Sequence, residues 1–406
     1  MEPVVGIVAE YNPFHFGHAR QIEQLKRQTV VNATVAVMSG YFTQRGLPAV
    51  AAPHKRAEAA VRCGIDLVIE LPLPFCSFNA GVFAAGAVKL LQATGVVTAL
   101  SFGMETPGEP LRETASILVH ESAAFKAALR QNLDSGASYA VSRAQAAQAE
   151  LGRPSPLFSS PNNLLALSYV EAALRQGWNP DLFPIQREGA GYSDSRPCGR
   201  LSSAAAVRAL LAENRTDEAL VCVPAPSAEI LKCCLRGGRA VTDTKRYWTA
   251  LKVLLHRETS ESLQSYAEFG EGIENALLDA YEDAPTVEEL VERLSTRRYP
   301  RTRLFRQLLY VFLGLKQPEN KAFQSAGPQW IRPLAASPNG RRLLAQMGDA
   351  AHLPVVSRLG DVPHSDIAQS MALLGLRGAK LWEELTDAPR SRDVLKEHFI
   401  LADPCP

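Results

Sequence analysis

Apolar runs of strand length alternate with stretches of helical spacing through the first hundred residues of the chain. Apolar strands that alternate with helices are typical of a parallel sheet covered on both faces, so the pattern predicts an α/β, Rossmann-like domain. The expected strands are residues 3–9, Val31–Met38, Asp66–Leu71 and Val96–Phe102. The expected helices are residues 18–28, His54–Cys63 and Ala80–Thr94.

Three of these strands end in segments suited to binding a ligand. Asn12–His18 follows the first strand, Ser39-Gly40 follows the second, and Gly103 follows the fourth. In an open parallel sheet, ligands bind beyond the carboxyl ends of the strands. The three segments are therefore expected to converge on one crevice.

The pattern then becomes mainly helical. Residues 108–180 have helical spacing that is interrupted at Pro154–Pro161, and Asp181–Gln186 is a fifth expected strand. A polar loop follows at residues 187–200, and a helix is expected to begin near Ser203.

The second half of the chain carries few strand signals. From about residue 215 the pattern is mostly helical, and Pro318–Trp330 is expected to be an inner loop. The predicted organisation is a sheet domain over residues 1–214 and a mostly helical domain over residues 215–406.

Composition narrows the class of protein. No run among the 406 residues is long and apolar enough to span a bilayer, and the N-terminus lacks the features of a secretory signal. The seven cysteines form no C-x-x-C pair, which argues against a zinc cage and is typical of reduced thiols, so we expect a cytoplasmic protein without a resident metal. A net charge of +1 argues against a strongly basic protein, although a local cluster can still bind RNA.

The most specific short motif is His15-Phe16-Gly17-His18, at the first strand-to-helix junction. A helix N-terminus offers free N–H groups to a phosphate, and a glycine lets the backbone approach a nucleotide. The two imidazoles can donate hydrogen bonds to an α-phosphate as charge builds on it. A pair of histidines at this spacing also occurs as a simple helix cap, but the position after a strand favours adenylyl transfer.

Two further segments allow a structural and a functional interpretation. Ser203 to Arg208 fits an S-x-x-x-[IV]-R pattern, which is either a capped alanine-rich helix or a site for the β- and γ-phosphates and the leaving pyrophosphate. The loop Ser39–Gly46 is either a surface turn or a substrate lid with Gln44 and Arg45 facing the acyl or phosphate group.

Asn162 and Asn163 follow Pro161 at an expected helix start. Asparagine at such a position usually caps the helix, and we expect this of at least one of the two. The other would meet the adenine or the ribose of a nucleotide.

Five arginines form the only strongly basic cluster, and they lie within ten residues. They precede and enter an apolar helical pattern that begins at Leu304, so they are either a solvated basic face or a phosphate-binding surface. Cations at a helix N-terminus are unfavourable against the helix dipole, which an anionic partner would offset. The arginines are Arg297, Arg298, Arg301, Arg303 and Arg306.

Taken in order along the chain, these segments resemble the bacterial tRNA(Met) cytidine acetate ligases, a branch of the H-x-G-H nucleotidyltransferases. The resemblance covers most of the chain and is far more specific than any one motif. It rests on the segments 6–18, 37–46, 66–72, 100–106, 160–170, 187–194, 202–208 and 299–309.

The resemblance implies an ATP-dependent ligase that forms acetyl-adenylate and transfers the acetyl group to the wobble cytidine of elongator tRNA(Met). The products would be N4-acetylcytidine, AMP and pyrophosphate. Mg²⁺ would be bound through the ATP phosphates. His15 and His18 would stabilise the α-phosphate, and Arg301, Arg303 and Arg306 would hold the tRNA.

The resemblance also assigns an ATP-binding set. It comprises Ile7, Val8, Ala9, Glu10, Tyr11, Asn12, Pro13, Phe14, His15, Phe16, Gly17, His18, Ala19, Arg20, Gly103, one or both of Asn162 and Asn163, Arg187 and Glu188, with Ser203 and Arg208 at the phosphates.

Two alternatives remain open from the residues. A small-molecule adenylyltransferase would use the same histidine motif without needing the arginine-rich helical half. A tRNA-binding protein with a degenerate nucleotide site is a third hypothesis, against which the intact motif residues argue. No membrane and no obligate protein partner are expected.

Overall fold

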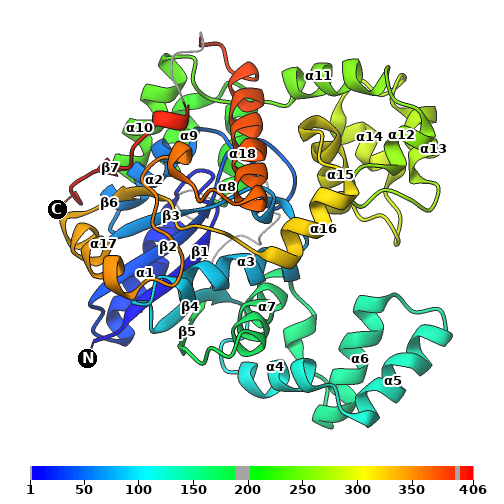
Figure 1. The fold of residues 1–406 in the computed structure, drawn as a ribbon, viewed down its shortest axis with the longest axis horizontal. Coiled ribbons are helices and arrows are strands. Elements are labelled where there is room, and N and C mark those ends of the chain that lie inside the picture. Colours follow the sequence, from blue (N-terminus) through cyan, green and yellow to red (C-terminus); the bar gives the residue numbers. More distant parts are fainter. Residues whose placement is uncertain (1, 188–201, 389–393, 406) are drawn as a thin grey trace.

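A seven-stranded sheet forms the centre of the computed structural model, which describes residues 2–187, 202–388 and 394–405 (Figure 1). The strand order is β5-β4-β1-β2-β3-β6-β7. All neighbours are parallel except β3 and β6, which pair antiparallel. The predicted parallel sheet is therefore confirmed. The strands are β1 (Val4–Ala9), β2 (Ala33–Ser39), β3 (Leu67–Leu71), β4 (Ala99–Met104), β5 (Asp181–Gln186), β6 (Pro333–Ala336) and β7 (Ile400–Leu401).

Helices of the first half cover both faces of this sheet. Side chains of β2 show why: Val35 and Val37 pack into the larger core with α3, whereas Ala36 and Met38 pack with α1 and α2. Successive side chains of a strand point to opposite faces, so a run that is apolar throughout needs a helix on each side. The helices are α1 (Phe16–Gln28), α2 (Pro53–Arg62), α3 (Ala80–Ala93), α4 (Leu111–His120), α5 (Ala123–Asp134), α6 (Tyr139–Leu151), α7 (Pro161–Arg175) and α8 (Ala204–Ala212), with short 3-10 turns η1 (Phe75–Ser77) and η2 (Pro156–Phe158).

The second half is mostly helical, as predicted. Its helices α11 to α15 extend from the sheet on the same side of the molecule as the α5–α6 hairpin, on the right in Figure 1. The elements are α9 (Thr216–Val221), α10 (Ala225–Arg236), α11 (Lys245–Leu255), α12 (Ser260–Gln264), α13 (Ile273–Ala280), α14 (Val287–Leu294), α15 (Arg301–Leu313), α16 (Gln317–Ala326), α17 (Pro338–Ala350), α18 (Asp366–Glu384), η4 (Leu359–Asp361) and η5 (Val394–Lys396). No helix in the described part of the chain is long and apolar enough to cross a membrane.

Two features of this half differ from the sequence-based expectation. The prediction of an inner loop at Pro318–Trp330 is wrong, because α16 occupies most of this segment. Pro318 lies in the first turn, where a proline is tolerated, and Glu319 accepts a hydrogen bond from the Lys316 backbone N–H at 3.3 Å.

The second difference is that β6 and β7 return to the edge of the sheet. β6 has four residues and β7 has two, which is too short to produce an alternating pattern. Residues 215–406 therefore complete the sheet of the first half as well as forming helices of their own. A domain boundary near residue 214 stays a prediction.

Candidate active site

A cleft opens at the carboxyl ends of β1, β2 and β4, where the sequence predicted one. Its empty volume, including space open to solvent, is about 1220 Å³. Helices α1, α7 and α8 and the loop after β2 supply most of its other walls. The predicted residues that line it are Val8, Ala9, Glu10, Tyr11, Asn12, His15, His18, Gly103, Asn162, Arg187, Ser203 and Arg208.

His15 and His18 are fixed by the start of α1. The Nδ1 atom of His15 accepts a hydrogen bond from the Gly17 backbone N–H at 2.9 Å. The Nδ1 atom of His18 accepts from the backbone N–H of His15 at 3.2 Å, so the two side chains form a reciprocal capping box. Because a backbone N–H can only donate, the ring proton of each neutral imidazole lies on Nε2. The motif thus presents two adjacent N–H donors, with ring centroids 3.9 Å apart.

Gly17 is needed for this geometry. A Cβ atom at this position would lie 2.7 Å from His15 Cε1 and 2.9 Å from His15 Nδ1. Any side chain would therefore displace the ring that caps the helix. The glycine of the motif makes room for the first histidine, in addition to any approach by a ligand.

Both histidines are held in the neutral form. Burial, with the nearby guanidinium groups of Arg187 and Arg208, lowers the pKa of His15 to about 3. Burial and the neighbouring His15 lower the pKa of His18 well below its ordinary value. The two neutral imidazoles can therefore act as hydrogen-bond donors at neutral pH, and their hydrogen bonds strengthen as negative charge develops on the acceptor.

Arg56 of α2 ties the strand ends beneath the cleft together. Its buried guanidinium donates to the carbonyl oxygens of Ser39 at 2.8 Å and Ala51 at 2.9 Å, and also to those of Glu10 and Gly40. β1 and β2 are thereby joined at the point where their carbonyls leave the sheet ladder. Loss of this side chain would leave several buried acceptors without a partner.

Two arginines from different elements bring positive charge to the cleft. Arg208 of α8 donates from Nη1 to the carbonyl oxygen of Asn12 at 2.6 Å, which joins the helix to the histidine loop. Ser203 caps α8 by accepting from the Ala206 N–H at 3.1 Å. Arg187 passes over Gly103, where a Cβ would lie 3.1 Å from Arg187 Cγ. The cleft therefore has cationic groups on two walls, as an anionic ligand requires.

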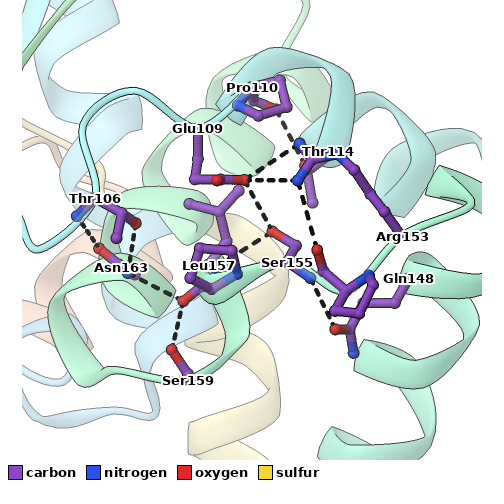
Figure 2. A network of polar contacts seen from close by, with 12 residues as sticks. Thr106, Glu109, Pro110, Thr114, Gln148, Arg153, Ser155, Leu157, Ser159 and Asn163 are labelled. Atoms are coloured by element: carbon purple, nitrogen blue, oxygen red, sulfur yellow. Dashed lines mark hydrogen bonds and ion pairs between the residues drawn. The ribbon is translucent and has the colours of Figure 1, made fainter.

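The structure separates the two asparagines at the start of α7. Asn163 is 1 % exposed, and hydrogen bonds within the protein use both ends of its side-chain amide. Its Oδ1 accepts from the backbone N–H groups of Glu105 and Thr106, and its Nδ2 donates to Thr106 Oγ1 and the Pro156 carbonyl (Figure 2). Asn162 lines the cleft and donates from Nδ2 to Glu105 Oε1 at 2.5 Å. Asn163 thus fastens the loop after β4, and Asn162 faces the ligand space.

Other members of the predicted ATP-binding set do not line the cleft. Ile7 and Phe14 are buried in the core that α1 and α2 share with the sheet. Pro13 precedes α1, and Phe16, Gly17, Ala19 and Arg20 lie in its first turns beside the histidines in sequence. Glu188 lies outside the described residues.

Several cleft residues were not predicted from the sequence. An apolar wall consists of Phe83, Phe102, Leu165, Ala166 and Tyr169. The last three follow Asn162 at helical spacing on α7, so this face was visible in the sequence once Asn162 was placed in the site. Gln44 and Arg45 of the loop after β2, which the sequence offered as candidate substrate-facing residues, also line the cleft, and this favours that role over a plain surface turn.

The arginine cluster lies at the start of α15, and its members differ in exposure. Arg301 is exposed and pairs with Glu292, and Arg303 stacks over Tyr299 at 4.5 Å. Arg306 is only 6 % exposed and pairs with Glu268 at 3.4 Å. This burial argues against the expectation that Arg306 contacts RNA, because its guanidinium lies inside the protein beside Glu268.

A model of the HIGH nucleotidyltransferase family matches residues 1–396. A tRNA(Met) cytidine acetate ligase of Syntrophomonas wolfei is 37% identical over 363 residues, which cover 87% of this chain and 86% of that protein. The corresponding ligase of Anoxybacillus flavithermus is 35% identical, with 90% and 91% covered.

Solved structures give the same result. Thermotoga maritima TmcAL without ligand matches with a TM-score of 0.92 and 30% identity, covering 99% of this chain and 100% of that chain. The same protein bound with alpha-thio ATP matches with a TM-score of 0.91 and 29% identity, at the same coverage. The chain belongs to the tRNA(Met) cytidine acetate ligase family of HIGH nucleotidyltransferases.

Proposed function

We propose that this protein activates acetate with ATP and transfers the acetyl group to the wobble cytidine of elongator tRNA(Met). The observation that carries the proposal is the histidine pair, whose Nδ1 atoms both accept backbone N–H groups. Attack of acetate on the α-phosphate places extra charge on its oxygens. Two fixed Nε2–H donors at the N-terminus of α1 stabilise that charge without reorganisation.

The rest of the cleft suits the parts of ATP. Arg187 and Asn162 lie beside the apolar wall and are assigned to the nucleoside and its first phosphate. Ser203 and Arg208 at the start of α8 are assigned to the β- and γ-phosphates and to departing pyrophosphate.

Acetate and Mg²⁺ complete the first step. Gln44 and Arg45 are the polar groups of the loop after β2 and are assigned to the acetate side of the cleft. The described residues contain no group of three metal-ligating side chains, so Mg²⁺ would be carried on the ATP phosphates and would neutralise their charge.

The tRNA is assigned to the arginine-rich start of α15. Arg301 and Arg303 have access to solvent there, and phosphate contacts by arginine would position the anticodon arm. A cytidine in an anticodon loop is unpaired and can be unstacked into the cleft at low cost. A tRNA substrate places the reaction in the cytoplasm.

The test is a reaction of the purified protein with ATP, acetate and unmodified elongator tRNA(Met), followed by nucleoside mass spectrometry and an AMP assay. N4-acetylcytidine that depends on both ATP and acetate is expected. AMP formation without modified RNA would show that the acceptor is another molecule. Absence of AMP under all conditions would contradict the proposed activity.

A further inference from the structure

We propose that Glu10 is the proton acceptor for the cytidine amine in the acetyl-transfer step, an inference that rests on the proposed function. The amine must lose a proton as it becomes an amide, so a base within reach of the acetyl-adenylate accelerates the reaction. Nothing in the histidine motif supplies such a base.

The histidines, Tyr11 and the arginines of the described cleft lining are unsuited to this task. His15 and His18 use the lone pairs of Nδ1 for backbone N–H groups and carry their protons on Nε2. Burial raises the pKa of the Tyr11 hydroxyl, which leaves it protonated at neutral pH. Arg187 and Arg208 are cations and have no lone pair to offer. Glu10 is the one carboxylate among the described residues that line the cleft.

The position of Glu10 is fixed by Gln44 and Arg56. Its Oε1 accepts a hydrogen bond from the backbone N–H of Gln44 at 2.7 Å. Its carbonyl oxygen accepts from the buried guanidinium of Arg56. The side chain is half-buried, and the hydrogen bond from Gln44 uses Oε1 and not Oε2. One carboxylate oxygen is thus anchored to the loop after β2, and the other is available to a ligand.

A carboxylate in a cleft for a polyphosphate is otherwise costly, because like charges repel and burial weakens solvation. The carboxylate has a use that accounts for this cost if an amine enters beside the nucleotide after pyrophosphate has left. The two sides of the cleft then divide the work: the histidines donate to the phosphate, and Glu10 accepts from the nucleophile.

The proposed step is an acyl transfer from the adenylate to the cytidine amine. The N4 lone pair of cytidine attacks the carbonyl carbon of acetyl-adenylate, and a C–N bond forms. The bond from that carbon to the phosphate oxygen breaks, and AMP leaves with the electron pair. The N4 proton passes to Glu10 Oε2 and then to water. No oxidant, reductant or further reactant is needed.

Hydroxylamine separates the two steps experimentally, because it is a free base at neutral pH and captures acetyl-adenylate without help. In Glu10→Gln, the amide oxygen still accepts from the Gln44 N–H, but the base is gone. We expect acetohydroxamate formation within about threefold of the wild type, with single-turnover transfer to tRNA reduced by about 10²–10⁴-fold. Glu23→Gln removes an exposed carboxylate paired with Arg27 and is the matched control, with both rates unchanged.

Other outcomes would overturn the assignment. An equal loss of hydroxamate and of transfer in Glu10→Gln would mean that Glu10 acts before or during activation. Recovery of both rates at raised Mg²⁺ would identify it as a metal ligand. Unchanged transfer would leave the AMP phosphate as the proton acceptor. If the wild type itself yields no acetohydroxamate, the proposed function fails and not merely the role of Glu10.

Discussion

The cleft at the sheet and the arginine-rich start of α15 differ in what holds their functional side chains in place. In the cleft, backbone N–H groups fix two neutral histidines, and Arg56 fixes the strand ends that carry them. At α15 the arginines already form ion pairs with glutamates of the protein. Arg298 pairs with Glu271 at 2.8 Å, and Arg301 pairs with Glu292.

The difference teaches what each region can do. Donors that are fixed before the substrate arrives stabilise a transition state without paying for reorganisation. Arginines that already have partners must exchange them for phosphate, so their contribution to binding is small and sensitive to salt. We therefore assign the chemistry to the first region and propose adjustable docking of a large anion at the second.

The largest expected effect is the loss of a fixed donor. In His18→Ala, acetate-dependent exchange of pyrophosphate into ATP should fall by about 10²–10³-fold, because one Nε2–H donor at the α-phosphate is missing. Binding of tRNA should be unchanged in a filter assay. His364→Ala, at an exposed histidine, is the control. Exchange within about threefold of the wild type would remove the histidines from the mechanism.

Removing the support beneath the cleft should be the next largest effect. Arg56→Met should lower the free energy of unfolding by about 3–5 kcal/mol, since buried carbonyls lose a charged donor. Arg62 lies on the same helix as Arg56, and Arg62→Met breaks only an exposed pair with Glu229 of α10, so it should cost less than about 1 kcal/mol in urea denaturation. An equal loss of unfolding free energy in the two variants would show that the hydrogen bonds of Arg56 do not hold the strand ends.

The fold of the cleft was predictable because it depends on short-range features. A histidine two residues before Gly17 can cap its own helix, and β1 leads directly into that helix. The strands β1 to β4 are mainly apolar on both faces, which the sequence shows plainly. The choice of Asn162 over Asn163 was not predictable, because it depends on where the loop after β4 lies in space.

The arginine region was predictable only as a cluster. Arg303 and Arg306 are three residues apart, yet one stacks over Tyr299 near solvent and the other is buried against Glu268. Glu268 precedes Arg306 by 38 residues, so no local pattern could show that the Arg306 side chain faces inward. Strands β6 and β7 were missed for the same reason, because pairing with a distant strand edge defines them.

The neutral histidines also predict how stability depends on pH. The pKa of His15 is about 3 in the folded protein and about 6.5 in an unfolded chain, so the unfolded state binds the proton first as pH falls. The stability contribution is complete above pH 6.5 and should decline by up to about 2 kcal/mol between pH 6.5 and 5. Urea denaturation at both pH values measures it. A wild type and a His15→Gln variant with equal pH dependence would contradict the assignment.

The smallest effect is expected in the arginine region. In the double variant Arg301→Gln and Arg303→Gln, tRNA affinity should fall about tenfold, and the slope of log affinity against log salt should decrease by about 1.5. ATP binding should be unchanged. Arg306→Gln should leave the salt slope as it is, because the buried guanidinium meets no phosphate. A reduced slope in Arg306→Gln would mean that the region rearranges on binding.

The most direct test of the central claim follows the oxygen atoms of acetate. The reaction is run with ¹⁸O-labelled acetate, ATP and elongator tRNA(Met), and the AMP and the modified nucleoside are analysed by mass spectrometry. An acetyl-adenylate formed at the α-phosphate predicts one labelled oxygen in AMP and one in the acetyl group of N4-acetylcytidine. Unlabelled AMP beside acetylated cytidine would contradict activation of acetate at the histidine pair.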